Sequence, residues 1–254
     1  SATRINSDGL VQDMQSITDV DLVLNGDFDE LGDEVYDDDI TAAINGGTWV
    51  DNGDGTFTVT GDGTPNTGIG VRDAYAGYLT NGKTYKWTVE ADNVTLALYD
   101  DSYALVTSGT SPLYFTATAT NRLYISPTDG VSATYSNVSI KQVDPNDRWT
   151  LGKDWRIEDG ELIHTGSASY AFQGSLRAGD VYEAVVVVTE ADATNFVMLY
   201  IGGFQDAMTS PGTYTFIVTA VSGDAINLRG SGDCRVDSIS VKNITFDQEN
   251  VDLA

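Results

Sequence analysis

The chain has 254 residues, enough for one large domain or two ordinary ones, and 41% of them are hydrophobic, which is enough for well-packed cores. Its 13 Lys and Arg against 38 Asp and Glu give a formal net charge of −25, which disfavours nucleic acid because phosphate binding needs clustered cations. One cysteine excludes an intrachain disulfide, and no apolar run approaches the roughly 18 residues of a membrane span. We therefore expect a soluble, cytoplasmically made protein with neither a nucleic acid nor a membrane as its partner.

Residues 1–19 have no counterpart before the second half of the chain and lack the apolar core of a signal peptide. Such an unpaired segment is typical of an arm that becomes ordered on a partner. We expect an extended arm here. Its candidate docking residues are Arg4, Ile5, Leu10 and Val11.

The rest of the chain contains an internal duplication. A pattern of Trp, short strand, acidic-glycine turn, short strand and Thr-Gly occurs as WVDNGDGTFTVTG and again as WRIEDGELIHTG. Three more segments match in the same order and at nearly constant intervals, which is hard to obtain by chance. The matched pairs begin at Trp49 and Trp155, Leu79 and Leu176, Ser111 and Ser210, and Tyr135 and Val236.

Each copy consists of short segments in which apolar and polar residues alternate, separated by Gly, Asn and Asp. This period of two predicts antiparallel strands, and many short strands at such spacing favour a sandwich or jelly roll. The stretch VDPNDRW, from Val143 to Trp149, is a short linker. The prediction is an all-β protein with two tandem antiparallel β-sandwich (jelly-roll) domains, 20–145 and 146–246, between the arm and a polar tail at 247–254.

The main difference between the copies is a longer loop from Gly61 to Leu79 in the first. Exposed aromatic side chains can stack on the faces of sugar rings. Tyr75 and Tyr78 lie in this loop and are the better exposed carbohydrate-binding candidates. Trp49 is a third candidate, although its match with Trp155 favours a role in the core.

The stretch LVLNGDFDE, from Leu22 to Glu30, resembles the first strand of carbohydrate-binding modules of families 4, 9 and 22. The segment WTLGKDWRIEDGEL and the last strand of each copy are also similar to these jelly rolls. The resemblance implies a structural calcium ion between first and last strands. The positions that match its ligands are Asp27, Asp29, Glu30, Asn137 and Asp237, and the alternative is a solvated acidic loop.

The N-terminal stretch SATRINSDGLVQ is similar to a segment that recurs in tail and other virion proteins of tailed bacteriophages. There it often precedes lectin-like β-sandwich domains. The resemblance implies a virion structural protein, such as a capsid decoration, head fibre or tail accessory protein, located in the virion and attached to other capsid or tail proteins. Homo-oligomers, trimers among them, are expected because such components sit on symmetric lattices.

Catalytic signatures are missing from the sequence: it has no Gly-x-Ser-x-Gly, no His-Glu-x-x-His and no phosphate-cradling loop. A histidine-based site would rest on His164 alone, and a strand residue without a catalytic role is the better interpretation. We expect no enzyme activity and no certain cofactor. The leading hypothesis is assembly and surface display on a virion; the alternative is a carbohydrate-binding module for adhesion to host-surface glycans.

Overall fold

The computed structural model describes residues 3–5, 11–13, 21–36, 47–64, 69–74, 79–119 and 121–245. Every regular element in these ranges is a β-strand and these strands pair in antiparallel fashion, so the predicted all-β fold is confirmed. None of the described residues belongs to a helix that could cross a membrane. In the predicted arm, β1 (Thr3–Ile5) pairs with β2 (Val11–Asp13), which places Arg4 opposite Gln12 and Ile5 opposite Val11. Leu10 lies outside the described residues.

The chain divides into two compact units. One consists of Glu30–Pro145 and is called the inserted unit; the other consists of Ser1–Asp29 together with Asn146–Ala254 and is called the split unit. The predicted boundary between residues 145 and 146 coincides with this division. The prediction placed residues 20–29 in the first domain, whereas the contacts group them with the second.

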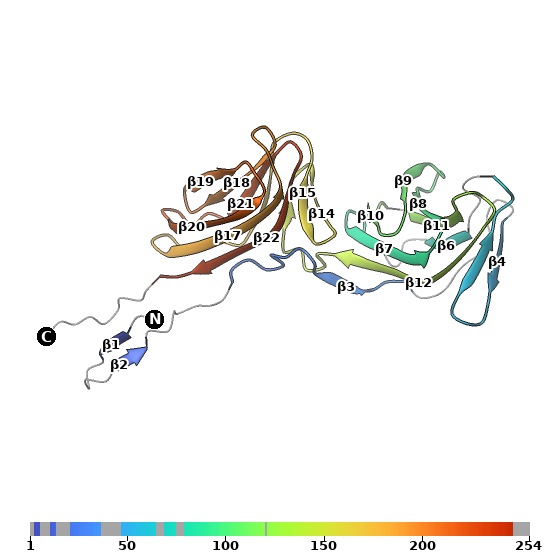
Figure 1. Cartoon of the computed structure of the whole chain (residues 1–254), viewed down its shortest axis with the longest axis horizontal. Coiled ribbons are helices and arrows are strands. Elements are labelled where there is room, and N and C mark those ends of the chain that lie inside the picture. Colours follow the sequence, from blue (N-terminus) through green and yellow to red (C-terminus); the bar gives the residue numbers. More distant parts are fainter. Residues whose placement is uncertain are drawn as a thin grey trace. The chain divides into compact units, whose positions relative to one another are not determined.

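The inserted unit contains two sheets, and both can be followed in Figure 1. One has the order β10-β7-β12-β5-β4, with β3 also pairing with β12, and the other has the order β6-β11-β8-β9. The strands are β3 (Leu31–Glu34), β4 (Thr48–Asp51), β5 (Phe57–Thr60), β6 (Ile69–Ala74), β7 (Thr84–Ala91), β8 (Val94–Tyr99), β9 (Leu105–Gly109), β10 (Leu113–Thr116), β11 (Asn121–Pro127) and β12 (Ser132–Val143).

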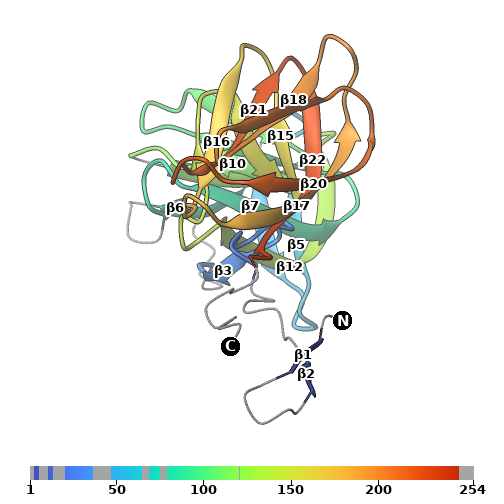
Figure 2. The same cartoon turned by 90° about the vertical axis from the view of Figure 1, so that its left-hand side faces the viewer.

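The split unit repeats this arrangement, with sheets β14-β15-β22-β17-β20 and β13-β16-β21-β18-β19 (Figure 2). The strands are β13 (Thr150–Leu151), β14 (Trp155–Glu158), β15 (Glu161–His164), β16 (Ser169–Gln173), β17 (Val181–Glu190), β18 (Phe196–Ile201), β19 (Phe204–Met208), β20 (Gly212–Thr219), β21 (Ile226–Ser231) and β22 (Cys234–Asn243). Strands β4, β5, β7, β10 and β12 of the inserted unit thus correspond in order to β14, β15, β17, β20 and β22.

The matched segments that begin at Leu79 and Leu176 share a Leu-x-x-Gly-x-x-Tyr motif, which has the same role in both units. The Tyr85 hydroxyl accepts a hydrogen bond from the Thr80 amide at 2.8 Å, and the Tyr182 hydroxyl accepts one from the Arg177 amide at 2.8 Å. Both tyrosine rings are buried in their cores. A buried hydroxyl needs a partner, and here the partner is the loop that begins the strand, so the motif fixes that loop on the core.

Segment 21–29 joins the split unit by running along β22. The Leu22 amide donates to the Val241 carbonyl at 2.8 Å, and the Ile239 amide donates to the Gly26 carbonyl at 2.8 Å. The Asp21 carboxylate also accepts from the Val241 amide at 2.9 Å. A Cβ at Gly26 would lie 2.2 Å from the Ile239 carbonyl oxygen, so only glycine allows this close approach.

Side chains of the split unit hold the same segment from two more directions. The Gln173 amide both accepts from the Leu24 amide and donates to the Leu24 carbonyl, each at 3.0 Å. Trp149 Nε1 donates to the Asn25 carbonyl at 3.0 Å, and the Trp149 ring lies 5.4 Å from the buried ring of Phe28. Residues that precede the inserted unit therefore complete the fold of the split unit.

Candidate functional site

The outer face of one sheet in the split unit contains a pocket of about 510 Å³. Strands β16, β18, β19 and β21 supply its walls, together with the turn between β18 and β19. The lining residues are Tyr170, Phe172, Tyr200, Ile201, Gly202, Gly203, Phe204, Gln205, Asp224, Ala225 and Asn227. The pocket is therefore rich in aromatic rings and contains a few polar side chains.

Four of these residues form a row across the sheet. Phe172 is opposite Asn227, Asn227 is opposite Tyr200, and Tyr200 is opposite Gln205. Phe172, Asn227 and Tyr200 alternate with buried neighbours along their strands, so they share the solvent-facing side of the sheet. Gln205 is exposed and pairs with Tyr200, which places it on the same side. The result is an alternating aromatic–amide row, which we define as Phe172, Asn227, Tyr200 and Gln205.

Aromatic contacts hold Tyr200 and Phe204 of the pocket lining. Tyr170 meets Tyr200 edge-on with ring centroids 5.8 Å apart, and Phe204 lies 5.4 Å from Phe216 of β20. Tyr170 and Phe172 still expose 44% and 38% of their surfaces. Large aromatic rings left this exposed on a sheet face are uncommon without a ligand or partner.

A tight turn shapes one end of the pocket. Gly202 and Gly203 have φ values of 55° and 90°, a conformation that favours glycine. A Cβ on Gly202 would lie 2.6 Å from the Ala220 Cβ, so the turn is pressed against the end of β20. At the rim, the Asp224 carboxylate accepts a hydrogen bond from the Ser222 hydroxyl, and the Asn227 side chain donates to the Ala225 carbonyl at 2.8 Å.

The aromatic–amide row places aromatic faces and hydrogen-bonding amide groups side by side on one small surface. Aromatic faces favour contact with C–H-rich ring faces, and side-chain amides offer both donors and acceptors for hydroxyl groups. A ligand with an apolar ring face and hydroxyls at its edge, such as a pyranose, matches this pattern.

The inserted unit has a different row at the corresponding place. There Arg122 is opposite Asp73 and Tyr99, and Tyr99 is opposite Leu105. The Arg122 guanidinium lies 4.2 Å from the centre of the Tyr103 ring and donates to its hydroxyl at 3.0 Å. An Arg thus stands where the split unit has Asn227, and its guanidinium lies over the ring of Tyr103, which is still 58% exposed.

The aromatic residues predicted to bind carbohydrate lie elsewhere. Tyr75 and Tyr78 are outside the described residues. Trp49 is half-buried at the edge of the inserted unit's core, where it stacks on Phe57 at 5.4 Å and donates from Nε1 to the Tyr135 hydroxyl at 3.2 Å. Its counterpart Trp155 is buried and donates to the Ser169 carbonyl. Both tryptophans therefore pack against their own units.

The predicted calcium ligands are not gathered around one point in either unit. Asp27 and Asp29 belong to the split unit, near the turn at Gly160, and both are exposed. Asp237 is exposed on β22, whereas Asn137 is on β12 of the inserted unit and donates to Glu90 at 2.7 Å. Within the described part of the chain, no three His, Cys, Asp or Glu side chains form a group that could hold a metal ion. Calcium binding, including at Glu30, stays a prediction.

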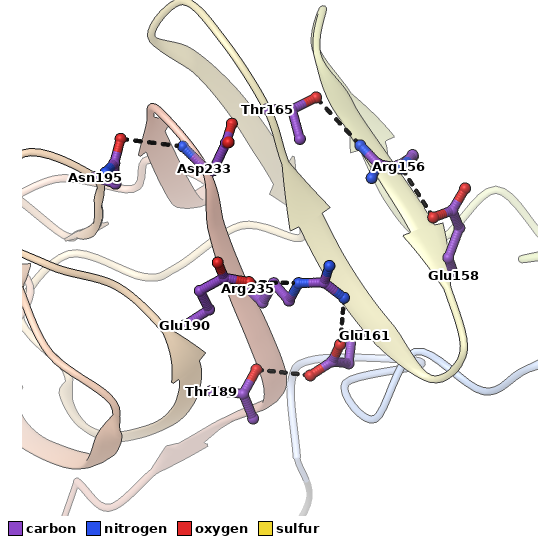
Figure 3. A network of polar contacts seen from close by, with 9 residues as sticks. All are labelled: Arg156, Glu158, Glu161, Thr165, Thr189, Glu190, Asn195, Asp233 and Arg235. Carbon is purple, nitrogen blue, oxygen red and sulfur yellow. Dashed lines mark hydrogen bonds and ion pairs between the residues drawn. The ribbon is translucent and has the colours of Figure 1, made fainter.

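The main charged cluster of the split unit joins strands together. Figure 3 shows Arg235 of β22 between Glu190 of β17, at 2.7 Å, and Glu161 of β15, at 3.2 Å. Hydrogen bonding to Glu161 and then Glu190 raises the pKa of the Arg235 guanidinium. Thr189 donates to the other oxygen of Glu161 at 2.6 Å. These contacts occupy the carboxylates in cross-strand pairing.

His164 and Cys234 are both buried in the split unit. The two ring nitrogens of His164 lie 2.7 Å from the Gly232 carbonyl and 3.0 Å from the Ser167 carbonyl, so the ring links two turns. Burial raises the pKa of the Cys234 thiol to about 11, which keeps it protonated and unreactive at neutral pH.

Sequence reasoning missed the aromatic–amide row. One local signal is present in SYAFQ, from Ser169 to Gln173. The aromatic residues Tyr170 and Phe172 are exposed there, whereas Ala171 and Gln173, which alternate with them, are buried. A strand whose large aromatic rings alternate with smaller buried residues indicates a functional outer face.

No protein-family model and no curated protein matches the chain. Similar solved structures include a conserved protein of unknown function from Pseudomonas aeruginosa PAO1, with 11% identity over 79% of this chain and 89% of that one, at a TM-score of 0.20. HutD from Pseudomonas fluorescens SBW25 has 10% identity over 78% and 98%, at a TM-score of 0.21. A cupin 2 conserved barrel domain protein from Leptotrichia buccalis has 7% identity over 85% and 97%, at 0.19. Likenesses this weak carry no argument about function.

Proposed function

We propose that the split unit binds a neutral carbohydrate in its pocket. The observation that carries this proposal is the solvent-facing row of Phe172, Asn227, Tyr200 and Gln205, in which aromatic and amide side chains alternate across four strands. Ring stacking supplies contact area at low entropic cost, and the amides orient the hydroxyls of the sugar. The pocket volume of about 510 Å³ is in the range of small-ligand sites.

The electrostatics favour an uncharged glycan over an acidic one. The whole chain carries a net charge of −25, and Asp224 adds a carboxylate at the rim of the pocket. A uronic or sialic acid would approach against this field, whereas a neutral hexose or its polymer would not. The proposed activity is binding without bond cleavage.

A glycan array that carries neutral and acidic surface polysaccharides tests the proposal. We expect binding to neutral members. Phe172→Ala and Tyr200→Ala should each weaken binding about tenfold, since an aromatic contact contributes roughly 0.5–1.5 kcal/mol.

Tyr103→Ala is the matched control, because Tyr103 is an exposed aromatic residue of the inserted unit. It should leave binding unchanged. Circular dichroism and thermal unfolding confirm that each variant is folded. An array without any bound neutral glycan, or equal binding by Phe172→Ala, Tyr200→Ala and the parent chain, would contradict the proposal.

A second candidate function is assembly into a bacteriophage virion, as a capsid decoration, head fibre or tail accessory protein that other virion proteins hold. The phage-like stretch SATRINSDGLVQ favours this candidate. Segment 21–29, which follows the arm directly, is fixed to β22 by backbone hydrogen bonds, so an anchored arm would hold the split unit firmly. Arg4, Ile5, Leu10 and Val11 remain its proposed docking residues.

Deletion of residues 1–19, followed by measurement of incorporation into purified particles, tests the second candidate. We expect the truncated protein to fold and to be lost from particles. Unchanged incorporation would contradict docking through the arm. Because the deletion leaves the pocket intact, its glycan binding should be normal, so the two candidates are tested separately.

A further inference from the structure

The split unit has four edge strands, and three of them are unsuited to pairing with another chain. These are the edges of its two sheets: β13, β19, β14 and β20. Strand β13 has only two residues, β19 contains Asp206, and β14 contains Arg156 and Glu158, which form an ion pair at 2.9 Å. Short length and charge are the usual protections against edge-to-edge pairing.

Strand β20 has neither protection. It has eight residues, and the stretch GTYTFIVTAV, from Gly212 to Val221, contains no charged residue and no proline in a chain with a net charge of −25. Among the strands of the split unit it pairs with β17 alone, so its other side presents unpaired backbone groups (Figure 2). An uncharged, β-branched edge of this length favours the addition of another strand.

The side chains of β20 also distinguish it. Tyr214 and Phe216 face inward and stack with ring planes 8° apart, which holds the strand in place. Facing outward, Ile217 exposes 61% of its surface, and Val221 just beyond the strand exposes 78%; these are the highest values among the large hydrophobic residues that the structure describes. Such residues at an open edge indicate a contact surface.

We propose that β20 is the surface through which two copies of this chain associate, by antiparallel pairing of the two β20 strands about a two-fold axis. A second copy fits this edge because two-fold symmetry places each uncharged strand against an identical one. Two chains with a charge of −25 repel each other over most of their surfaces, and this edge is where they can approach with the least repulsion. A basic partner would instead be attracted to the acidic surfaces.

Sedimentation equilibrium of the full chain tests the proposal. We expect a dimer whose dissociation constant falls when salt rises from about 0.1 M to about 1 M, because the Debye length shortens from about 10 Å to about 3 Å and repulsion is screened. Ile217→Glu and Thr215→Glu each add a like charge to both strands of the pair and should raise the dissociation constant at least about tenfold.

Val106→Glu is the matched control, since Val106 is an exposed residue of β9, the edge strand of a sheet in the inserted unit. It should leave the dimer unchanged, as should deletion of residues 1–19. Circular dichroism shows whether each variant is folded, and the two β20 variants give independent readings. A monomer at all concentrations, a trimer, or a dimer that persists in both β20 variants would overturn the proposal.

Discussion

The inserted and split units share a strand order but differ on one outer face. In both, one sheet contains five corresponding strands in the same order, and a buried tyrosine receives a hydrogen bond from the loop before its strand. On the other sheet, the split unit has Asn227 where the inserted unit has Arg122. The positions that match between the two copies fix turns and core, whereas the aromatic–amide row differs between them. We therefore expect function at the row, where the copies differ.

The cores also differ at one paired position. Trp49 is opposite Val59 in the inserted unit, and Trp155 is opposite His164 in the split unit. Both Val59 and His164 have no exposed surface. An apolar residue suffices in one core, whereas in the other an imidazole meets two carbonyl groups. The split unit holds a polar residue at this core position because the turns at Ser167 and Gly232 supply its hydrogen-bonding partners.

The largest expected effect concerns segment 21–29. Phe28→Ala should destabilise the split unit by about 3–5 kcal/mol, the usual cost of removing a buried aromatic ring, and leave the inserted unit unchanged. Hydrogen exchange measured by mass spectrometry should show faster exchange in β17 and β22 and constant exchange in β7 and β12.

Leu24→Ala is the control within the same segment, because Leu24 is 48% exposed. It should change exchange little in either unit. Equal loss of protection in both units after Phe28→Ala would break the assignment of this segment to the split unit.

A somewhat smaller effect is expected from His164→Val, which gives the split unit the residue of the inserted unit. One of the two carbonyls, Gly232 or Ser167 according to the tautomer, would lose its hydrogen-bond donor in a buried site, at a cost of about 1–3 kcal/mol. Denaturant unfolding measures this loss. A variant as stable as the parent chain would show that the imidazole contacts contribute nothing.

Alkaline pH should weaken each unit through one buried group. Burial raises the pKa of the Tyr135 hydroxyl to about 12 in the inserted unit and that of the Cys234 thiol to about 11 in the split unit. A raised pKa means that the unfolded chain loses its proton first, so stability is full below the unfolded pKa and falls as pH rises toward the folded value.

We expect a loss of about 2 kcal/mol per group between about pH 9 and pH 12, measured by denaturant unfolding at several pH values. Tyr135→Phe and Cys234→Ala should each flatten the pH dependence of one unit. Rapid labelling of Cys234 by a thiol reagent in the folded protein would contradict its burial.

Much of the fold could be predicted from the sequence, because the duplicated segments contain the residues that fix turns, strands and core. The position of segment 21–29 could not. Its partners on β22 lie more than two hundred residues away, as Asp21 and Val241 show, whereas sequence reasoning joins a strand to the domain that follows it. The carbohydrate candidates in the loop before Leu79 follow from a difference in loop length between the copies, and such a difference gives no information about residues on the strands.

The aromatic–amide row could not be predicted because it depends on register. Phe172, Asn227, Tyr200 and Gln205 come from four strands, and a shift of one residue in any pairing would turn a side chain to the core. The aromatic alternation around Phe172 is visible in the sequence, but its amide neighbours become visible only when β16, β21, β18 and β19 are aligned.

The proposed glycan site of the split unit lies where the inserted unit has Arg122 over Tyr103. The variant Asn227→Arg places the inserted unit's residue in the pocket, and Arg122→Asn is the reciprocal control. For both, the affinity is measured by calorimetric titration with a neutral glycan identified on the array. We expect more than about a tenfold loss of affinity for Asn227→Arg, with the free energy of unfolding within about 1 kcal/mol of that of the parent chain, and no change of affinity for Arg122→Asn. Undiminished binding by Asn227→Arg would contradict the proposed glycan site.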